Sequence, residues 1–363
     1  LSMRDTDIIK KDLNFICDSL QLEFEKISGK NILITGGAGF LGYYLVQSII
    51  NWNNNQKPYK KIKLTVIDNF IRGVPQWIKN ISISDEFNLV SHDIRKLLPK
   101  NLPLFSYIIH AASIASPIYY RKYPIETMDA NINGLRHLLD YSQINKKNIE
   151  GFLYFSTSEI YGDPDKENIP TTEDYRGNVS CVGPRACYDE SKRFGETLCV
   201  NFSSQYGIPI GIARPFNNYG PGLKINDGRV ISDFAKCVMN NEDIVLYSDG
   251  KPTRTFCYIA DAIIGYFKIL TLSEPGDIFN IGIEKPEISI NELANLIVNK
   301  SKKLFNYDGT LITKSSLDKD YLTDNPNRRC PSIEKARKQI GFNPTIDITD
   351  GIERSLIWYK FNS

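Results

Sequence analysis

The chain has 363 residues, of which 42% are hydrophobic and 24% charged, so it is long enough for one large or two smaller globular domains. A formal net charge of +2 indicates neither nucleic acid nor an anionic membrane as a partner, and no apolar run is long enough to span a bilayer. Seven cysteines without paired spacing predict reduced thiols and a cytoplasmic protein, and three histidines without ligand spacing predict no metal site.

Residues 1–29 form an N-terminal extension whose apolar side chains, from Ile8 to Phe24, recur at roughly helical spacing. The pattern predicts an amphipathic helix that packs on the body of the protein or on a neighbouring subunit. A partly ordered extension accounts for the same pattern equally well, and both interpretations stay open here.

From residue 31 onward, short apolar stretches alternate with longer helical ones. Strands are expected at 31–35, 62–67, 87–90, 107–109, 152–156 and 208–213, and helices at 39–50, 124–143 and 185–206. This alternation predicts an α/β fold, a Rossmann-type doubly wound parallel sheet. We expect residues 30–219 to form this domain, with 257–270 returning to it. Residues 220–256 and 271–363 would then form a smaller mixed α/β substrate-binding lobe.

A glycine-rich loop follows the first predicted strand, with Gly36, Gly39 and Gly42 in the spacing G-x-x-G-x-x-G. Such a loop at a helix N-terminus lets backbone N–H groups approach a pyrophosphate. Asp68 ends the second strand, where a carboxylate binds adenosine ribose hydroxyls and favours NAD over NADP. Arg72 lies nearby and is an alternative partner for a 2′-phosphate. The other predicted cofactor contacts are Phe40, Leu41, Asn69, Asp93, Ile94, Ala111 and Ala112.

Tyr188 and Lys192 lie four residues apart in a stretch that can be helical, so their side chains share one face. A nearby ammonium group lowers the pKa of a phenol and makes it a usable base. The pair alone is common by chance. It gains meaning from the upstream dinucleotide pattern and from Thr157-Ser158-Glu159, which lies between the two.

With these elements in order, the chain resembles the extended short-chain dehydrogenase/reductase family that acts on nucleotide sugars, and within it the UDP-glucuronate decarboxylases. The stretches most specific for this resemblance are Gly183–Lys192 and Ser156–Asp163. The resemblance implies bound NAD, a UDP-sugar substrate and a homodimer formed through two helices of each subunit, with 134–143 and 193–202 as candidates.

The resemblance also implies roles for individual residues. Tyr188 would take the proton of the sugar 4-hydroxyl, Lys192 would hold the nicotinamide ribose and lower the pKa of Tyr188, and Thr157 would bind the 4-oxygen. Glu159 would position the sugar ring and a water molecule, and Arg254 would bind the carboxylate or supply a proton. Arg214 would contact the cofactor, and the remaining substrate contacts would be Ser113, Tyr120, Ser158, Asn217, Arg229 and Arg329.

Thr157-Ser158-Glu159 matches the decarboxylase pattern, because 4,6-dehydratases of the family carry an acid in the middle position and 4-epimerases generally lack the glutamate. Both remain alternatives, as does a catalytically silent NAD-binding module that regulates a partner. The blander interpretations are a surface ion pair for Arg254 and a strand-end acid for Glu159. Gly222 departs from the family pattern, which usually has arginine at that position.

Overall fold

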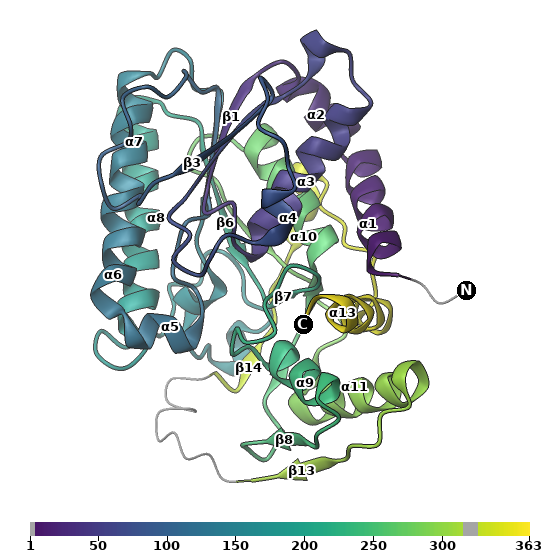
Figure 1. The fold of residues 1–363 in the computed structure, drawn as a ribbon. Coiled ribbons are helices and arrows are strands. Elements are labelled where there is room, and N and C mark those ends of the chain that lie inside the picture. The colour runs from purple at the N-terminus through teal and green to yellow at the C-terminus, as the bar shows by residue number, and fades with distance from the viewer. Residues whose placement is uncertain (1–3, 315–325) are drawn as a thin grey trace.

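The computed structural model describes residues 4–314 and 326–363, which form a central sheet with helices on both faces and a smaller lobe at one end (Figure 1). Residues 1–3 of the predicted extension and 315–325 of the predicted second lobe lie outside the described residues. The sheet has seven strands in the order β11-β6-β5-β4-β1-β2-β3, and every neighbouring pair is parallel. The predicted Rossmann-type sheet is confirmed. Its strands are β1 Asn31–Thr35, β2 Lys63–Asp68, β3 Phe87–Ser91, β4 Tyr107–His110, β5 Gly151–Phe155, β6 Ile210–Pro215 and β11 Ile278–Ile281.

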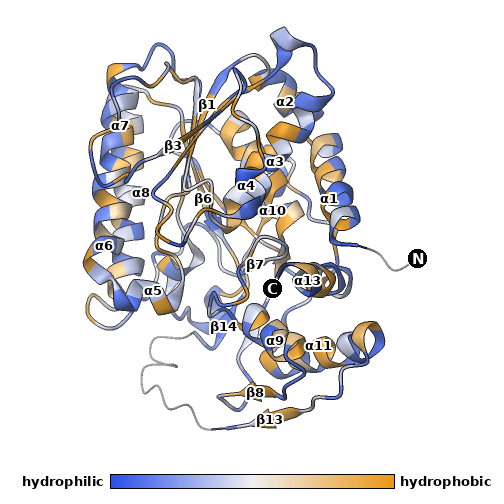
Figure 2. Cartoon of the chain, viewed as in Figure 1, coloured by the Kyte–Doolittle hydropathy of each residue, from blue (hydrophilic) through white to orange (hydrophobic). Residues whose placement is uncertain are grey.

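The inner strands are apolar along almost their whole length, because a parallel sheet is covered on both faces. Strands β4 and β5 are buried at every residue, and Figure 2 shows the hydrophobic colouring of the sheet interior. Ile34 of β1 lies between Val66 of β2 and Ile109 of β4 in register. Since all seven strands run the same way, their carboxyl ends meet at one edge, where ligands bind in such sheets.

Helices of the first domain lie on opposite sides of the sheet (Figure 1). One side carries α7 (Leu135–Ile144) and α8 (Ala186–Tyr206), and the other carries α3 (Phe40–Asn54) and α10 (Ile259–Leu272). The helix expected at 124–143 is continuous in direction but contains a π-helical turn, η2, between α6 and α7. Bounds of that run are α6 Pro124–Asp129 and η2 Ala130–Gly134.

The N-terminal extension packs on the body of its own chain. It forms α1 (Asp5–Ser19) and α2 (Gln21–Ile27), which contact α3, α10 and the C-terminal helix α13 (Ile348–Asn362). Ile8 and Phe24 are fully buried. The extension is therefore helical and packs on the body of the protein, as the first of the two interpretations predicted.

A buried carboxylate fastens α1 to the body. Asp12 is fully buried and accepts hydrogen bonds from the hydroxyls of Tyr44 and Tyr258, each at 2.6 Å. It also pairs with Arg354 of α13, whose Nη1 lies 2.5 Å from Oδ1. Three donors from three elements converge on one side chain, so α1 is part of the core.

The second lobe lies below the sheet in Figure 1 and contains α9, α11, β8 and β13. Strand β11 was assigned to this lobe from the sequence, but it pairs with β6 as the edge strand of the central sheet. Helix α10 overlaps the segment 257–270, which was expected to return to the first domain, and it contacts β5 and β6 of the sheet. The remaining elements are η1 Pro58–Lys60, α4 Gln76–Lys79, α5 Pro117–Lys122, η3 Ser158–Tyr161, η4 Lys166–Asn168, β7 Asn218–Tyr219, α9 Val230–Met239, β8 Ile244–Leu246, β9 Thr253–Arg254, β10 Cys257–Tyr258, β12 Ile288–Ser289, α11 Ile290–Phe305, β13 Leu311–Thr313, β14 Arg328–Arg329 and α12 Glu334–Ile340.

Candidate active site

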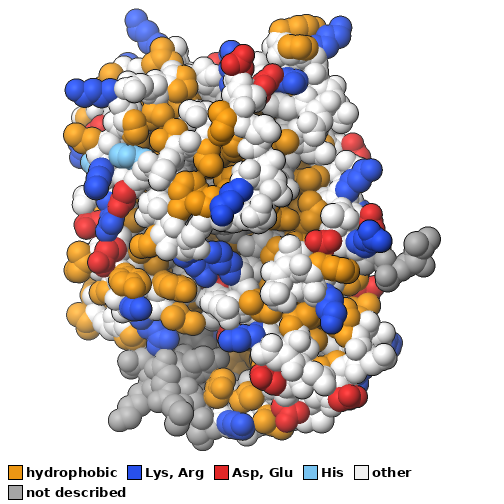
Figure 3. All heavy atoms as spheres, in the orientation of Figure 1, with side chains coloured by type: hydrophobic (Ala, Val, Ile, Leu, Met, Phe, Trp, Pro, Cys, Tyr) orange, Lys and Arg blue, Asp and Glu red, His pale blue; other side chains and the backbone are white. Residues whose placement is uncertain are grey.

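A cavity of about 680 Å³ lies at the carboxyl ends of β1, β2, β4 and β5, between the sheet and the second lobe. In the space-filling view, Lys and Arg side chains gather near the middle of this face (Figure 3). Among the described residues, eight basic and five acidic side chains line the cavity, and this excess suits an anionic ligand. The basic residues are Arg72, Arg95, Arg185, Lys192, Lys224, Arg229, Arg254 and Arg329, and the acidic residues are Asp68, Asp93, Glu126, Glu159 and Asp227.

The glycine-rich loop joins β1 to α3 at one end of the cavity. Gly36 has a φ of +72°, and a Cβ there would lie 2.5 Å from the backbone N of Ala112. A Cβ on Gly42 would lie 2.2 Å from the carbonyl O of Gly37, so Gly42 shapes the loop without lining the cavity. Helix α3 begins at Phe40, and its free N–H groups are the ready-made anion site that the sequence predicted.

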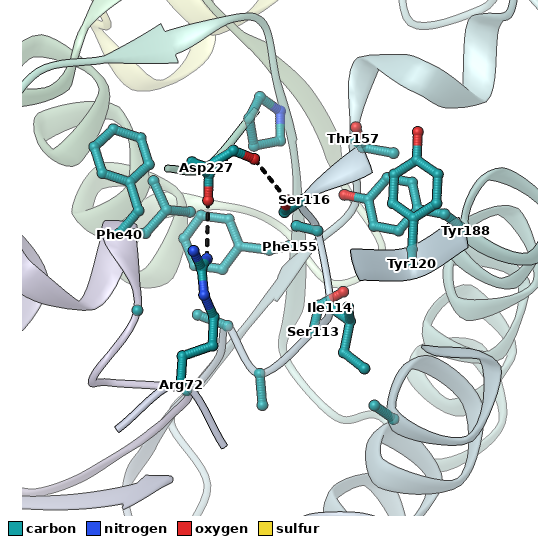
Figure 4. Close-up of a pocket in the computed structure, with 18 of the residues that line it drawn as sticks. Phe40, Arg72, Ser113, Ile114, Ser116, Tyr120, Phe155, Thr157, Tyr188 and Asp227 are labelled. Carbon is teal, nitrogen blue, oxygen red and sulfur yellow. Dashed lines mark hydrogen bonds and ion pairs between the residues drawn. The ribbon is translucent and has the colours of Figure 1, made fainter. Parts of the chain in front are cut away.

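Asp68 ends β2 beside this loop. Its carboxylate accepts hydrogen bonds from the backbone N of Ala38 at 3.0 Å and of Phe70 at 2.8 Å, while burial raises its pKa. Arg72 points away to the second lobe, where Nη1 lies 2.9 Å from Oδ1 of Asp227 (Figure 4). The alternative partner for a 2′-phosphate is therefore held by an acid of the other lobe.

The other predicted cofactor contacts, except Arg214, line the cavity. Asp93 is paired with Arg95, whose Nη2 lies 2.6 Å from Oδ2, and this hydrogen bonding lowers the pKa of Asp93. The remaining lining residues of this set are Phe40, Leu41, Asn69, Ile94, Ala111 and Ala112.

Arg214 lies outside the cavity, contrary to the prediction that it contacts the cofactor. Its Nε and Nη2 donate to Glu196 at 2.8 and 2.6 Å, and its Nη1 donates to the hydroxyl of Tyr161 and the carbonyl of Glu173. Both arginine and glutamate are buried. All these donors of the guanidinium bind groups inside the protein, so Arg214 ties β6 to Glu196, Tyr161 and Glu173.

Tyr188, Thr157 and Tyr120 meet inside the cavity (Figure 4). The rings of Tyr120 and Tyr188 are stacked, with centroids 5.1 Å apart and an interplanar angle of 9°. Burial raises the pKa of Tyr188 to about 12, although a hydrogen bond with Thr157 opposes the rise. The lowered pKa expected for Tyr188 is therefore wrong for this structure, in which burial outweighs the hydrogen bond.

Lys192 lies one helical turn beyond Tyr188 on α8. Its Nζ donates to the carbonyl of Phe155 at 2.7 Å and lies 5.9 Å from the centroid of the Tyr188 ring. Burial lowers the pKa of Lys192 to about 7. The ammonium therefore loses its proton near neutral pH, and while it is charged it favours the phenolate of Tyr188 at this distance.

Glu159 lines the cavity between arginines from two elements. Arg185 of α8 pairs with its Oε2, and Arg329 of β14 pairs with its Oε1. Burial raises the pKa of Glu159, but the charges of Arg185, Arg329 and Arg254 together lower it to about 2. The carboxylate is therefore ionised throughout the physiological range.

Arg254 is buried, which contradicts the interpretation of a surface ion-pair residue. It is 8% exposed and donates to the backbone carbonyls of Thr253 and Pro326 at 2.7 and 2.6 Å. Burial, followed by the neighbouring charge of Arg329, lowers its pKa to about 10. Predicted substrate contacts that line the cavity with it are Ser113, Tyr120, Ser158, Asn217, Arg229 and Arg329.

Several lining residues were not singled out from the sequence. Asp227 pairs with Arg72, and its backbone carbonyl accepts a hydrogen bond from Ser116 at 2.6 Å (Figure 4). Behind the lining, Asn131 in the π-helical turn joins the lining residue Ser113 to Ser191 by hydrogen bonds of 2.7 and 2.8 Å. These links depend on tertiary contacts and could not be predicted from the sequence. Arg185 could have been predicted to lie near the site, because it precedes Tyr188 by three residues in a stretch expected to be helical.

Among residues 4–314 and 326–363, the structure contains no group of histidine, cysteine and acidic side chains that could hold a metal ion. No helix in those ranges is both long and apolar enough to cross a membrane.

The family model described as the NAD dependent epimerase/dehydratase family matches residues 32–282. The chain belongs to this family. It is 34% identical to UDP-glucuronic acid decarboxylase 1 of Xenopus tropicalis, over 91% of this chain and 72% of that protein. It is 35% identical to UDP-glucuronic acid decarboxylase 6 of Arabidopsis thaliana, over 90% of this chain and 87% of that protein.

Solved structures of the family share the fold. One is UDP-glucuronic acid 4-epimerase from Bacillus cereus in complex with NAD, with a TM-score of 0.72 and 26% identity over 91% of this chain and 96% of that one. Another is UDP-glucose 4-epimerase from Thermotoga maritima, with a TM-score of 0.76 and 23% identity over 92% and 99% of the two chains. The match to the family model begins after α1 and α2, so the N-terminal helices lie outside it.

Proposed function

We propose that the protein converts UDP-glucuronate to UDP-xylose, with NAD as a recycled cofactor. The observation that carries the proposal is the meeting of Thr157, Glu159 and Tyr188 in one basic cavity. Support comes from relatives named UDP-glucuronic acid decarboxylase, to which this chain is 34–35% identical over about nine tenths of its length.

The residues present fit NAD. Gly36 leaves space that a Cβ would close, α3 presents its N-terminus, and Asp68 stands where a ribose would lie. When bound, NAD would take a hydride from C4 of the sugar and return it later. Because a carboxylate at position 68 repels a 2′-phosphate and Arg72 is paired with Asp227, we propose NAD over NADP.

Tyr188 is the proposed base for the 4-hydroxyl, and Thr157 shares that proton through its hydrogen bond with Tyr188. A ketone at C4 lies β to the C6 carboxylate, so loss of carbon dioxide leaves an enolate that the 4-oxygen delocalises. Tyr188 and Thr157 would stabilise the charge on that oxygen, and C5 would then accept a proton.

Glu159 and Arg254 are proposed to act at the C5 and C6 end of the sugar. Glu159 is ionised, so it accepts hydrogen bonds from a sugar hydroxyl or from a water molecule that protonates C5. The buried guanidinium of Arg254 would favour an anionic carboxylate before decarboxylation. Arg229 is the proposed partner of the diphosphate, whereas Arg329, which pairs with Glu159, is proposed to lie at the sugar end of the substrate.

The proposal includes a homodimer in a reducing, cytoplasmic compartment. All seven cysteines are unpaired in the structure. Phe194 and Val200 of α8 are 47% and 39% exposed, and Ile125 and Met128 of α6 add to the apolar surface on this side of the sheet. Light scattering on the wild type and on a Phe194→Glu variant tests the dimer, which the added charge should dissociate.

A substrate panel tests the activity. Purified protein is incubated with UDP-glucuronate or UDP-glucose, and the sugar nucleotides are followed by mass spectrometry and NMR. Loss of one carbon dioxide from UDP-glucuronate alone supports the proposal. Loss of water from UDP-glucose would indicate a 4,6-dehydratase, and an unchanged mass with an inverted C4 would indicate a 4-epimerase. A protein that binds NAD and changes none of these would be a silent module.

A further inference from the structure

Helix α8 carries two interleaved pairs of side chains at i and i+4. One is Tyr188 with Lys192, and the other is Arg185 with Asp189. Arg185 and Tyr188 both line the cavity, and Asp189 lies 5% exposed behind them. The second pair has no part in the mechanism described so far.

Arg185 reaches from α8 to the carboxylate of Glu159, which belongs to the 3₁₀ turn η3. Its Nη2 donates to Oε2 of Glu159, while Arg329 of β14 holds Oε1 from another direction. Each carboxylate oxygen is therefore held by a different arginine, and the Glu159 side chain has one orientation. Removal of Arg185 would free Oε2 and let the carboxylate turn about the remaining contact.

Asp189 faces Arg185 from one turn further along the helix. Its Oδ2 lies 3.7 Å from Nε of Arg185, and neither that Nε nor Oδ1 of Asp189 makes a hydrogen bond in the structure. The pair is thus electrostatic, and an ionised Asp189 attracts the guanidinium of Arg185 toward its own helix. Burial, with the charge of Glu159, raises the pKa of Asp189 to about 7, so the carboxylate is ionised and pairs with Arg185 above neutral pH.

Among the described residues, titratable and charged groups from α8, β14, β9 and α5 act on Glu159. These groups are Arg185, Tyr188 and Asp189 of α8, Arg329 of β14, Arg254 of β9 and Tyr120 of α5. Burial raises the pKa of Glu159, and Arg185 is the strongest of the influences that lower it. Loss of this charge would move the pKa of Glu159 upward, into a range that kinetics can reach.

We propose that Arg185 is a positioning residue that holds the Glu159 carboxylate ionised and aimed into the cavity, and that Asp189 holds Arg185 in place. The inference rests on the proposed function and adds two residues to it. Arg185 acts through Glu159 and needs no contact with the substrate.

A double-mutant cycle between Arg185 and Glu159 tests this relation. Arg185→Met, Glu159→Gln and the combined variant are compared for kcat, KM and NADH absorbance during turnover of UDP-glucuronate. We expect both single variants to lower kcat at least tenfold with little change in KM, and to accumulate NADH because steps after C4 oxidation slow. The combined variant should be no slower than Glu159→Gln, because residues that act as one unit are not additive.

The pH profile separates positioning from a structural role. Arg185→Met should lose kcat as the pH falls below about 6, since Glu159 becomes protonated in the acid range. Arg185→Lys keeps the charge, so its profile should stay flat there, although kcat falls because lysine cannot form the arginine fork. Asp189→Asn should lower kcat less than Arg185→Met and leave the acid side of the profile flat.

Arg337→Met is the matched control, because Arg337 pairs with Glu284 at 2.7 Å outside the cavity. Thermal unfolding and bound NAD are measured for every variant, and if Arg185→Met does not fold, Arg185→Lys and Asp189→Asn decide. The inference is overturned if Arg185→Met keeps the wild-type kcat and pH profile, or if Arg185→Lys and Asp189→Asn both keep them. It is also overturned if the combined variant is slowed by the product of the two single effects. If the wild type releases no carbon dioxide, the proposed function fails instead.

Discussion

Replacement of Lys192 by methionine tests how the site makes a base of Tyr188. Burial raises the pKa of Tyr188 to about 12, so at pH 8 about one molecule in ten thousand would carry the phenolate without help. Lys192 can supply that help, because its pKa of about 7 lets the pair lose a proton near neutral pH. When the Tyr188–Lys192 pair has lost one proton, the remaining proton is on either Tyr188 or Lys192. The molecules that keep it on Lys192 carry the phenolate of Tyr188.

The size of the effect follows from the separation of the two groups. At 5.9 Å from Nζ to the ring centroid and an effective dielectric constant of about 20, the attraction is about 2.8 kcal/mol, which is about two pKa units. The wild-type kcat/KM should therefore rise with pH through about 7 and then level off. At pH 8, one unit above the pKa of about 7 of Lys192, one of those two units is lost because the lysine is mostly unprotonated. The methionine variant should therefore be about tenfold slower at pH 8, and its kcat/KM should still be rising above pH 9.

The assay is kcat/KM for UDP-glucuronate from pH 5 to 10 at saturating NAD, with bound cofactor measured in each variant. Asp189 is the alternative source of a change near neutral pH, because burial, with the charge of Glu159, raises its pKa to about 7. Asp189→Asn should keep the rise near pH 7. A rise that survives in Lys192→Met and disappears in Asp189→Asn would refute the reasoning.

Three further predictions follow from the geometry. Tyr188→Phe should lower kcat by about 10² to 10⁴, the range of a lost general base, while NAD released on denaturation stays at the wild-type ratio; full activity would remove Tyr188 from the mechanism. Asp68→Ser should weaken NAD binding and lower the ratio of the NADP Kd to the NAD Kd about tenfold, which is about 1.4 kcal/mol, in a fluorescence titration; an unchanged ratio would mean that another group selects the cofactor. Asp12→Ala takes from buried Arg354 one of its two acidic partners, Asp350 being the other, and leaves the hydroxyls of Tyr44 and Tyr258 without their acceptor. It should cost about 3–5 kcal/mol of unfolding free energy, measured in denaturant, whereas Asp7→Ala, an exposed position, should cost little; equal stabilities would show that α1 does not depend on this carboxylate.

Local pattern was enough to predict the sheet and the cofactor end of the site. The six strands expected from apolar runs all occur, because a parallel sheet buries both faces of each strand. The glycine spacing predicted the loop and the start of α3. The structure shows why glycine is needed at position 36, where a Cβ would collide with Ala112. Both signals lie within a few residues of chain.

Contacts between distant segments could not be predicted in the same way. Strand β11 is a short apolar run that follows the second-lobe segment 220–256, so nothing local assigned it to the central sheet. Arg214 follows the strand expected at 208–213, as a cofactor-contacting residue would, but it lies within β6, and its guanidinium pairs with Glu196, eighteen positions earlier. Arg72 pairs with Asp227, which lies 155 residues further along the chain, so its partner could not be read from the local sequence.

The fate of the hydrogen at C4 of the sugar tests the central claim most directly. The protein is given UDP-glucuronate that carries deuterium at C4, and the product is examined by NMR and mass spectrometry. The account predicts a UDP-pentose that has lost carbon dioxide and kept deuterium at C4, because the same cofactor takes and returns the hydride. A product of unchanged carbon number, or a decarboxylated product with no deuterium at C4, would contradict it.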